Sequence, residues 1–437
     1  MFEILPLLDC LHPYINQTTQ KQLSVIISAM LAMSGRVTML GISRWAGKGG
    51  SYRSVQRFFY TTICWPNLLW VFFREHCWRR HDTYLLVGDE VVVTKAGKHT
   101  YGLGRFFSSL YQQPVRGLAF FGLSLVSIEQ GHAYPVRIEQ VIRAPQPQIL
   151  PKVEKKRGRG RPKGSKNQDK TSVSLNRELL HIKSMITALL ELMWGSLSPT
   201  HLALDGHFGN NYAVQMARRV GLHLVSKLRY DSALYLPYQG ANSKRKYGQK
   251  LNPRQIDEPF LCERFCDKGI QTEIFQVPQV LHKEFAQALN VVIIVKTNLS
   301  THAQVHVILF SSDLELAYQN VIDYYSLRFQ IEFNFREAKQ FWGLEDFMNT
   351  TQTAVTNAVN LSFFMVNLSE RLLRDCRHDN AIFSVLDLKA CCRGYRYVEE
   401  VLKLLPQKPE PISWAQIIAK VANLGAIHPR QASEKPE

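Results

Sequence analysis

The first 78 residues carry the repeating apolar pattern of helices. Apolar side chains recur at intervals of three and four at Leu23, Ile26, Ile27, Met30 and Leu31. A short helix is predicted to follow over 38–45, and a glycine-rich break at 47–50 ends it. Ser51 is suited to cap a further helix over 51–60. We therefore expect a helical N-terminal region over residues 1–78.

The helix predicted over 51–60 carries two arginines, Arg53 and Arg57. Two helices joined by a glycine turn, with cations on the second helix, are typical of a helix-turn-helix that binds DNA. An all-helical subdomain with ordinary surface arginines would show the same pattern. The excess of basic residues in the chain favours contact of Arg53 and Arg57 with DNA.

The middle of the chain alternates strand and helix patterns. Residues 83–93 form a nearly continuous apolar run, which is typical of a strand buried on both faces. The elements predicted after it are strands at 117–128 and 131–141, a helix at 174–194, a strand at 201–204, a helix at 212–220 and a strand at 222–228. This order is that of an RNase H-like domain, in which helices flank a mixed sheet. The predicted fold class is therefore α/β.

Residues 231–310 interrupt this order. A basic, glycine-containing loop and three further strand patterns, at 271–277, 291–296 and 305–310, indicate a β-rich insertion. From residue 316 onward the chain is helical again. The predicted organisation is a helical N-terminal region at 1–78, an RNase H-like domain at 79–230 and 311–350, a β-rich insertion at 231–310 and a helical C-terminal region at 351–437.

The composition indicates a globular protein with a polyanionic partner. Of the 437 residues, 46% are hydrophobic and 20% are charged, which excludes a disordered or fibrous chain. Lysine and arginine number 53 against 36 acidic residues, giving a net charge of +17. Such a charge favours nucleic acid over a small neutral substrate as the partner.

Residues 145–170 concentrate this positive charge. They hold nine lysines and arginines against two acidic residues, as expected for a basic loop. Within the loop Arg159, Arg161 and Lys163 belong to an Arg-Gly-Arg-Pro-Lys-Gly segment that resembles an AT-hook, which lies in a narrow minor groove. Gly158 stands where the usual hook has a proline. A solvated basic linker with nonspecific affinity for phosphates is the alternative.

Cysteine usage and hydropathy predict the compartment. Eight cysteines in a chain of this length are too few for a disulfide framework and are expected to be reduced. Cys262 and Cys266 lack a second cysteine or histidine pair at zinc-binding spacing. No basic leader and no long uncharged apolar run are present, so we expect neither secretion nor a membrane span. The expected location is the cytoplasm.

Three carboxylates are distinguished by their positions. Asp89 lies inside the buried strand pattern, Asp205 ends another strand, and Glu332 lies on a long predicted helix. A buried carboxylate is costly without a partner, and a divalent metal is a natural one. In an RNase H-like sheet the first and fourth strands are neighbours, which would bring Asp89 beside Asp205. Hard oxygen ligands favour Mg²⁺ or Mn²⁺.

The helix that carries Glu332 has a polar stripe. Charged and tyrosine side chains fall along one side of a single long helix at Tyr325, Arg328, Glu332, Arg336 and Lys339. An adjoining apolar face would bury the other side. A solvent-exposed face laced with salt bridges would place similar charges at these positions.

The spacing Tyr325-x2-Arg328-x3-Glu332-x6-Lys339 resembles the Tyr-Arg-Glu-Lys signature of a family of bacterial insertion-sequence DDE transposases. The resemblance covers about residues 80–350. It implies that Asp89, Asp205 and Glu332 hold two Mg²⁺ ions, for which Mn²⁺ can substitute. It also implies that Tyr325, Arg328 and Lys339, with Arg336, grip DNA phosphates.

The same resemblance implies a reaction and partners. The family cuts double-stranded DNA at the terminal repeats of its element and joins it to target DNA by hydrolysis and transesterification, through a hairpin intermediate. It acts as a homodimer on DNA, without a membrane, in the bacterial nucleoid. The best-known members stack a flipped base on a tryptophan of the insertion. Here no tryptophan falls within 231–310, and Tyr235, Tyr238 and Tyr247 are the candidates.

Two other functions fit part of this pattern. One is a catalytically silent DNA-binding regulator derived from a transposase, against which the presence of all three acids argues. The other is an RNase H-like nuclease that cuts without joining. Only the Tyr-Arg-Glu-Lys resemblance separates this second function from a transposase.

Overall fold

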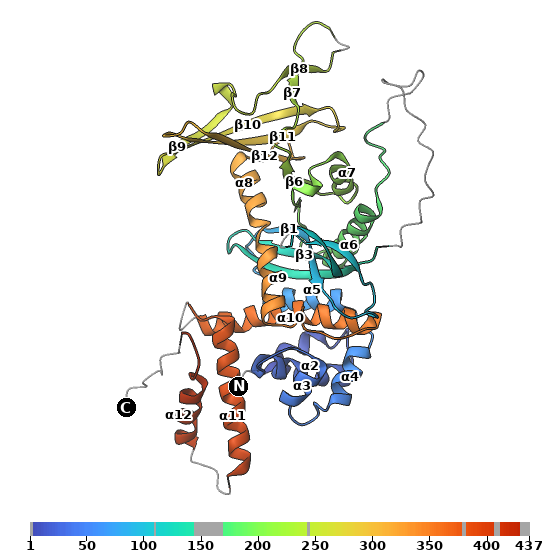
Figure 1. The fold of residues 1–437 in the computed structure, drawn as a ribbon, viewed down its shortest axis with the longest axis vertical. Helices are drawn as coiled ribbons and strands as arrows, with labels where there is room; N and C mark the ends of the chain where they lie inside the picture. The colour runs from blue at the N-terminus through green and yellow to red at the C-terminus, as the bar shows by residue number, and fades with distance from the viewer. Residues whose placement is uncertain are drawn as a thin grey trace.

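The computed structural model describes residues 3–108, 111–143, 169–242, 245–377, 382–405 and 411–428. The chain is elongated, with strands in the middle and upper parts of Figure 1 and the N- and C-terminal helices in the lower part. The predicted AT-hook-like residues Arg159, Arg161 and Lys163 lie outside the described residues. Their role in DNA binding stays a prediction.

The fold is mixed α/β. Its strands are β1 (Tyr84–Thr94), β2 (Gly104–Ser108), β3 (Gln113–Ser127), β4 (His132–Val141), β5 (His201–Ala203), β6 (His223–Leu228), β7 (Leu234–Pro237), β8 (Tyr247–Lys250), β9 (Leu261–Asp267), β10 (Ile270–His282), β11 (Leu289–Asn298) and β12 (Gln304–Ser311). Its helices are α1 (Ile4–Leu7), α2 (Gln17–Ala32), α3 (Met39–Trp45), α4 (Tyr52–Tyr60), α5 (Trp65–His76), α6 (Arg177–Met193), α7 (Asn211–Arg219), α8 (Tyr318–Leu327), α9 (Gln330–Gln340), α10 (Gln352–Arg377), α11 (Val385–Leu404) and α12 (Pro411–Ala422).

One hydrogen-bonded sheet of 12 strands runs through the molecule in the order β2-β3-β1-β5-β6-β12-β11-β10-β7-β8, with β4 on β3 and β9 on β10. β1 pairs antiparallel with β3 and parallel with β5, and β5 pairs parallel with β6. The neighbouring placement of the strands at 83–93 and 201–204 is thus as expected from the sequence. The sheet is mixed because β12 then joins β6 in the antiparallel direction.

The strands between residues 231 and 310 extend this sheet. β12 pairs with β6 through Ile308–Leu228 and Ser311–Val225, so hydrogen bonding continues across the predicted boundary. Four strands were not predicted from the sequence: β2, β7, β8 and β9. β2 has one fully buried side chain, and β7 to β9 are short or largely exposed, so they lack the apolar runs that the sequence analysis relied on.

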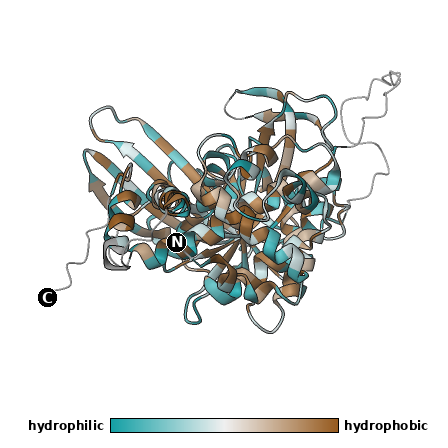
Figure 2. Cartoon of the chain, turned by 90° about the horizontal axis from the view of Figure 1, so that it is seen from below, coloured by the Kyte–Doolittle hydropathy of each residue, from teal (hydrophilic) through white to brown (hydrophobic). Residues whose placement is uncertain are grey.

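The core is built on β1 and β3. Leu85, Leu86 and Val87 of β1 are at most 1% exposed, and β3 is buried from Gly117 to Ser127. Helices cover this part of the sheet, since α9 packs against β1, β3 and β4 while α10 packs against β4. In Figure 2 hydrophobic stretches run through the strands near the centre, and the peripheral loops are mostly hydrophilic. Of the described helices, none combines the length and hydrophobicity that a membrane crossing requires.

The N-terminal helices form as predicted. Thr38 caps α3, and Ser51 caps α4 by accepting a hydrogen bond from the Ser54 amide. Gly49, between the two helices, has φ +89°, a conformation that favours glycine. Arg53 and Arg57 of α4 are both exposed.

A buried asparagine fastens this helical region to α10. Asn357 is 1% exposed, and its Nδ2 donates to the carbonyls of Phe58, Phe59 and Thr61 at the end of α4. Its Oδ1 accepts a hydrogen bond of 2.8 Å from the Trp65 indole. One side chain thereby satisfies polar groups from the α4–α5 connection, which would otherwise be buried without partners.

We expect Asn357→Ala to lower the free energy of unfolding by about 3 kcal/mol, because it leaves the Trp65 indole and buried carbonyls unpaired. Urea unfolding followed by tryptophan fluorescence measures the change. Asn320→Ala, at an exposed position of α8, is the control and should be near neutral. Equal stability of both variants would show that the Asn357 hydrogen bonds contribute little.

Candidate active site

Asp89 lies on β1, where the strand passes between β3 and β5. It stands opposite Gly122 of β3, and Val87, two residues earlier, is in register with Ala203 of β5. β5 therefore ends beside Asp89, and the chain reaches Asp205 two residues after Ala203. The Asp89 side chain is 22% exposed. The strand pairing brings the first two predicted acids to the same part of the sheet.

Asp205 begins a tight turn that fixes its side chain. Its Oδ1 accepts from the His207 amide at 3.1 Å, and its main-chain oxygen accepts from the hydroxyl of the fully buried Ser226 at 2.7 Å. Gly209 completes the turn, because a Cβ there would lie 2.1 Å from the Lys227 carbonyl oxygen. The turn thus depends on a glycine and a buried hydroxyl as well as on the acid.

Glu332 lies in the first turn of α9, after a break that the sequence did not predict. The single long helix expected here is wrong: α8 ends at Leu327 and α9 begins at Gln330. At the join the amides of Phe329 and Glu332 donate to residues three positions earlier, at 3.1 and 3.0 Å. These bonds tighten the helix in the manner of a 3₁₀ turn. No glycine or proline marks the break.

Close packing holds α9 on the sheet. A Cβ on Gly122 would lie 3.2 Å from the ring of Phe335, so glycine opposite Asp89 lets the helix approach β3. The buried Asn334 donates from Nδ2 to the Ser124 hydroxyl at 3.2 Å, and Lys339 donates from Nζ to the Val92 carbonyl at 3.1 Å. These contacts fix the position of α9, and with it that of Glu332.

Arg328 connects two of the three acids. Its Nη1 lies 3.1 Å from Asp89 Oδ2, and its Nη2 lies 3.4 Å from Glu332 Oε1. The side chain is 12% exposed, and its carbon Cζ lies 5.7 Å from the centre of the Tyr325 ring. Arg328 comes from the join between α8 and α9. The partner that burial of Asp89 requires is therefore, in this structure, a guanidinium.

The pKa of Asp89 reports on the whole cluster. Burial raises the pKa of this carboxyl to about 6; Arg328 and the Glu90 amide oppose the rise, and the charges of Asp205 and Glu332 add to it. Burial likewise raises the pKa of Tyr325, with Arg328 opposing and Asp205 among the groups that add to the shift. The charges of Asp205 and Glu332 thus act on Asp89, and those of Asp205 and Asp89 act on Tyr325.

The cluster has the donor chemistry of a divalent-metal site. Three carboxylates from β1, the β5 turn and α9 supply hard oxygen ligands, which suit Mg²⁺ or Mn²⁺. Across the described ranges, however, no group of three histidine, cysteine, aspartate or glutamate side chains has the arrangement of a metal site. The side chains are of the kind that bind a divalent metal, but the Arg328 guanidinium lies between Asp89 and Glu332.

The remaining signature residues differ in their surroundings. Lys339 lies 3.2 Å from Glu345 besides its bond to β1, so it faces the sheet. Arg336 is exposed, and its guanidinium lies 4.5 Å from the Phe333 ring. Together with Glu337 it lines a small pocket on the surface of α9. The structure therefore brings Tyr325 and Arg328 to the acids and places Arg336 elsewhere on α9. Arg53 and Arg57 lie on α4, in the helical region below the sheet (Figure 1).

The structure adds two observations to the residues considered in the sequence: a lysine beside the Asp205 turn, and the surroundings of the tyrosines near β7 and β8. Lys227 is exposed on β6, and its Cε would lie 3.7 Å from a Cβ at Gly206, which places a cation beside the Asp205 turn. No motif in the sequence points to it. The rings of Tyr235 on β7 and Tyr247 on β8 lie 5.4 Å apart, and Arg245 stands 4.6 Å from the ring of Tyr238, the residue after β7.

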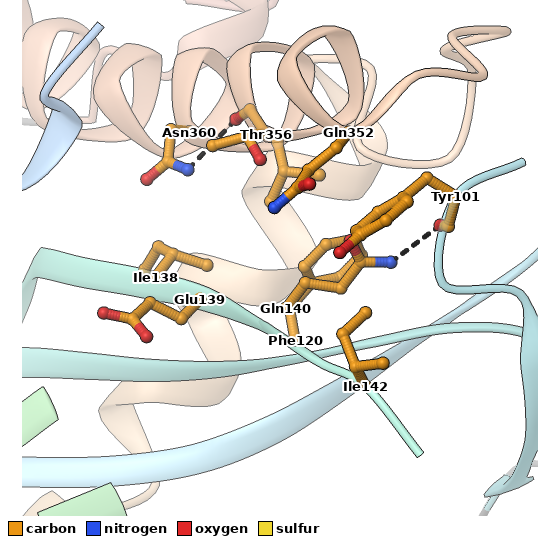
Figure 3. A pocket seen from close by; sticks show the side chains of 10 residues that line it. Tyr101, Phe120, Ile138, Glu139, Gln140, Ile142, Gln352, Thr356 and Asn360 are labelled. Atoms are coloured by element: carbon orange, nitrogen blue, oxygen red, sulfur yellow. Dashed lines mark hydrogen bonds between the residues drawn. The ribbon is translucent and has the colours of Figure 1, made fainter. Parts of the chain in front are cut away.

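A cavity lies on the sheet away from the acids. It has a volume of about 220 Å³ and is lined by Phe120, Gln140 and Asn360 among others, between β3, β4 and α10 (Figure 3). None of the three acids lines it. At the acid cluster the Glu332 side chain is 41% exposed, whereas those of Asp89 and Arg328 are 22% and 12% exposed.

Two family models match the chain. The one described as DDE superfamily endonuclease covers residues 6–268, and the one described as Transposase DDE domain covers residues 181–368. Because the first extends over more than half of the chain, the protein belongs to the DDE superfamily of endonucleases. With the second, which spans Asp205 and Glu332, it is a transposase-type nuclease. A comparison with curated proteins gave no match.

We expect Gly122→Val to displace α9 and to lower the free energy of unfolding by about 1–3 kcal/mol, because its side chain overlaps the Phe335 ring. Gly122→Ala should have a smaller effect in the same direction. Thermal unfolding and a DNA-nicking assay measure both changes. Adding Phe335→Leu to Gly122→Ala should restore stability, and failure of this rescue would assign the loss to β3 itself.

Proposed function

We propose that this protein is a DNA transposase that excises and integrates an insertion sequence by cutting and rejoining phosphodiester bonds. The observation that carries the proposal is the meeting of Asp89, Asp205 and Glu332, in the order and on the kinds of element expected of a DDE nuclease. We propose a domain organisation together with this activity. It is an RNase H-like domain at 79–230 and 311–350 with a β-rich insertion at 231–310, flanked by helical regions at 1–78 and 351–437.

Asp89, Asp205 and Glu332 would hold two divalent ions, Mg²⁺ or Mn²⁺. When bound, such ions supply activation of the attacking oxygen and stabilisation of the leaving 3′-oxygen. The chain's own contribution is positional. β1 and the Asp205 turn hold two carboxylates at adjacent strands, and the docking of α9 sets the third against them. A rigid arrangement of this kind favours in-line attack at one phosphate.

Cations beside the acids bind the substrate. A phosphate next to three carboxylates is repelled unless positive groups hold it, and Arg328 with Tyr325 lies where such a phosphate would sit. Arg336, exposed further along α9, would add a second cation for the DNA, and Lys339 would have to leave Glu345 to do the same. Lys227, beside the Asp205 turn, adds a cation that the signature does not include.

The rest of the pathway follows from the same assignment. Water first nicks an element end; the freed 3′-hydroxyl then attacks the opposite strand to form a hairpin, which is reopened before joining to target DNA. Tyr235, Tyr238 and Tyr247, on and beside β7 and β8, are the candidates for stacking an unstacked base. The AT-hook-like residues Arg159, Arg161 and Lys163 would add minor-groove contacts. The active form would be a homodimer on DNA in the bacterial nucleoid.

The decisive experiment incubates the purified protein with labelled DNA that carries the ends of its own element, with Mg²⁺ or with EDTA. Mg²⁺-dependent nicks followed by hairpins and joined products are expected. Nicks that never proceed would indicate a plain nuclease. Stable binding without cutting in Mg²⁺ or Mn²⁺ would indicate a silent regulator.

We expect Asp89→Asn, Asp205→Asn and Glu332→Gln each to reduce cleavage by about a thousandfold or more, because each removes a ligand whose ion contributes several kcal/mol in the transition state. Binding to element ends should persist. Gel-shift and cleavage assays on the same preparations separate the two effects. A variant that cuts at the wild-type rate would remove its residue from the proposed ligands.

We expect the double variant Arg53→Ala, Arg57→Ala to bind DNA more weakly and to reduce the slope of log affinity against log salt by about 2, because two phosphate contacts are lost. Fluorescence anisotropy over a salt series measures the slope. Arg74→Ala is the control, since Arg74 already pairs with Glu75 at 2.8 Å. An unchanged slope would mean that α4 does not contact DNA.

A further inference from the structure

Arg328 occupies the space between two proposed metal ligands. Its two terminal nitrogens reach Asp89 at 3.1 Å and Glu332 at 3.4 Å, and only 12% of its side chain is exposed. The tight join between α8 and α9 holds its backbone there, through hydrogen bonds that backbone amides donate to carbonyls three residues earlier. A positive charge is thus built into the acid cluster of the DNA-free chain.

A guanidinium and a divalent cation compete for these carboxylates. Divalent metals take carboxylate oxygens at about 2.0–2.6 Å, so an ion between Asp89 and Glu332 would need the oxygens that now face Arg328. Two cations at that separation would also repel each other. The arrangement agrees with this competition, because among the described residues no three candidate ligands are gathered as a metal site.

One nitrogen of the Arg328 guanidinium has no hydrogen-bond partner. Nε is buried and has no hydrogen-bond partner, although the other two nitrogens are engaged. A buried donor without a partner is costly, and a planar guanidinium can direct several donors at one phosphate. The Tyr325 ring next to it closes one side of this space. Arg328 therefore keeps one donor that its contacts with the acids do not use.

We propose that Arg328 is the resident counter-ion of the acid cluster: it competes with divalent metal for Asp89 and Glu332 until a DNA phosphate takes its guanidinium. This inference rests on the proposed function and adds a coupling to it. Metal and DNA then strengthen each other's binding, because each favours the state in which Arg328 has left the acids. A transposase without DNA would hold little metal and would be protected from stray cutting.

The test measures Mn²⁺ binding by full-length, DNA-free protein, using electron paramagnetic resonance of the free ion at mildly alkaline pH. Arg328→Gln should bind Mn²⁺ about tenfold more tightly than wild type, within the usual range of such couplings. The Mn²⁺ affinity of Arg328→Lys should fall between those of wild type and Arg328→Gln, because lysine keeps the positive charge but cannot donate to both carboxylates from one planar group. Arg137→Gln should behave as wild type; this control loses a similarly buried arginine, 17% exposed, that pairs with Glu139.

Each outcome bears on the proposal. Equal or weaker binding by Arg328→Gln would overturn it, and if wild type still cuts DNA the proposed function would stand. Absence of Mn²⁺ binding and of cutting in every protein would overturn both. Adding Asp89→Asn to Arg328→Gln should abolish the gain, which locates the ion at the acids. Should Arg328→Gln not fold, as thermal unfolding would reveal, Arg328→Lys against Arg137→Gln decides the matter alone.

A second measurement uses no metal. In EDTA, Asp89→Asn should strengthen binding of a fluorescein-labelled, mixed-sequence DNA duplex, since it removes a negative charge and releases Arg328. Loss of the Asp89 charge acts equally in wild type and in Arg328→Gln, whereas release of the guanidinium from Asp89 is possible only where Arg328 is present. The gain from Asp89→Asn should therefore be several-fold smaller in the Arg328→Gln background. Equal gains in both backgrounds would contradict the proposal.

Discussion

The docking of α9 on the face of β1 and β3 is the constraint on which the site depends. Gly122 leaves room for the Phe335 ring opposite Asp89, and Asn334 and Lys339 bond to the same two strands. Interiors are close-packed and respond to a change of one methyl group. The position of Glu332 is therefore set by a glycine that is distant from it in sequence and carries no chemistry of its own.

Electrostatics impose the second constraint. A carboxylate on a buried strand needs compensation, and Asp89 obtains it from Arg328, although burial still raises the pKa of Asp89 to about 6. The cluster is thus neither a closed salt bridge nor a preformed metal site. Under the exchange proposed above, a divalent cation would replace Arg328 at these carboxylates, as a site opened by its substrate requires.

The architecture separates the tasks of a DNA-processing enzyme. The acids lie where β1, the β5 turn and α9 meet, and the sheet continues through β12 into strands that carry an aromatic and cationic cluster. Below the sheet, Asn357 of α10 fastens the helix that exposes Arg53 and Arg57. Several positive or aromatic groups are therefore joined to the acid cluster through one sheet and the helix packed beneath it.

The sequence by itself determined the mixed α/β class and singled out the three acids as candidates, because apolar runs and residue spacing are local properties. The neighbouring of β1 and β5 was expected from the order of the strands and helices, and the sheet pairs them. The tertiary structure alone decided the rest. Edge strands such as β9 exist only through pairing with a neighbour, and the break before Glu332 has no glycine or proline to announce it. The contact of Arg328 with Asp89 joins residues 239 positions apart, which no local pattern encodes.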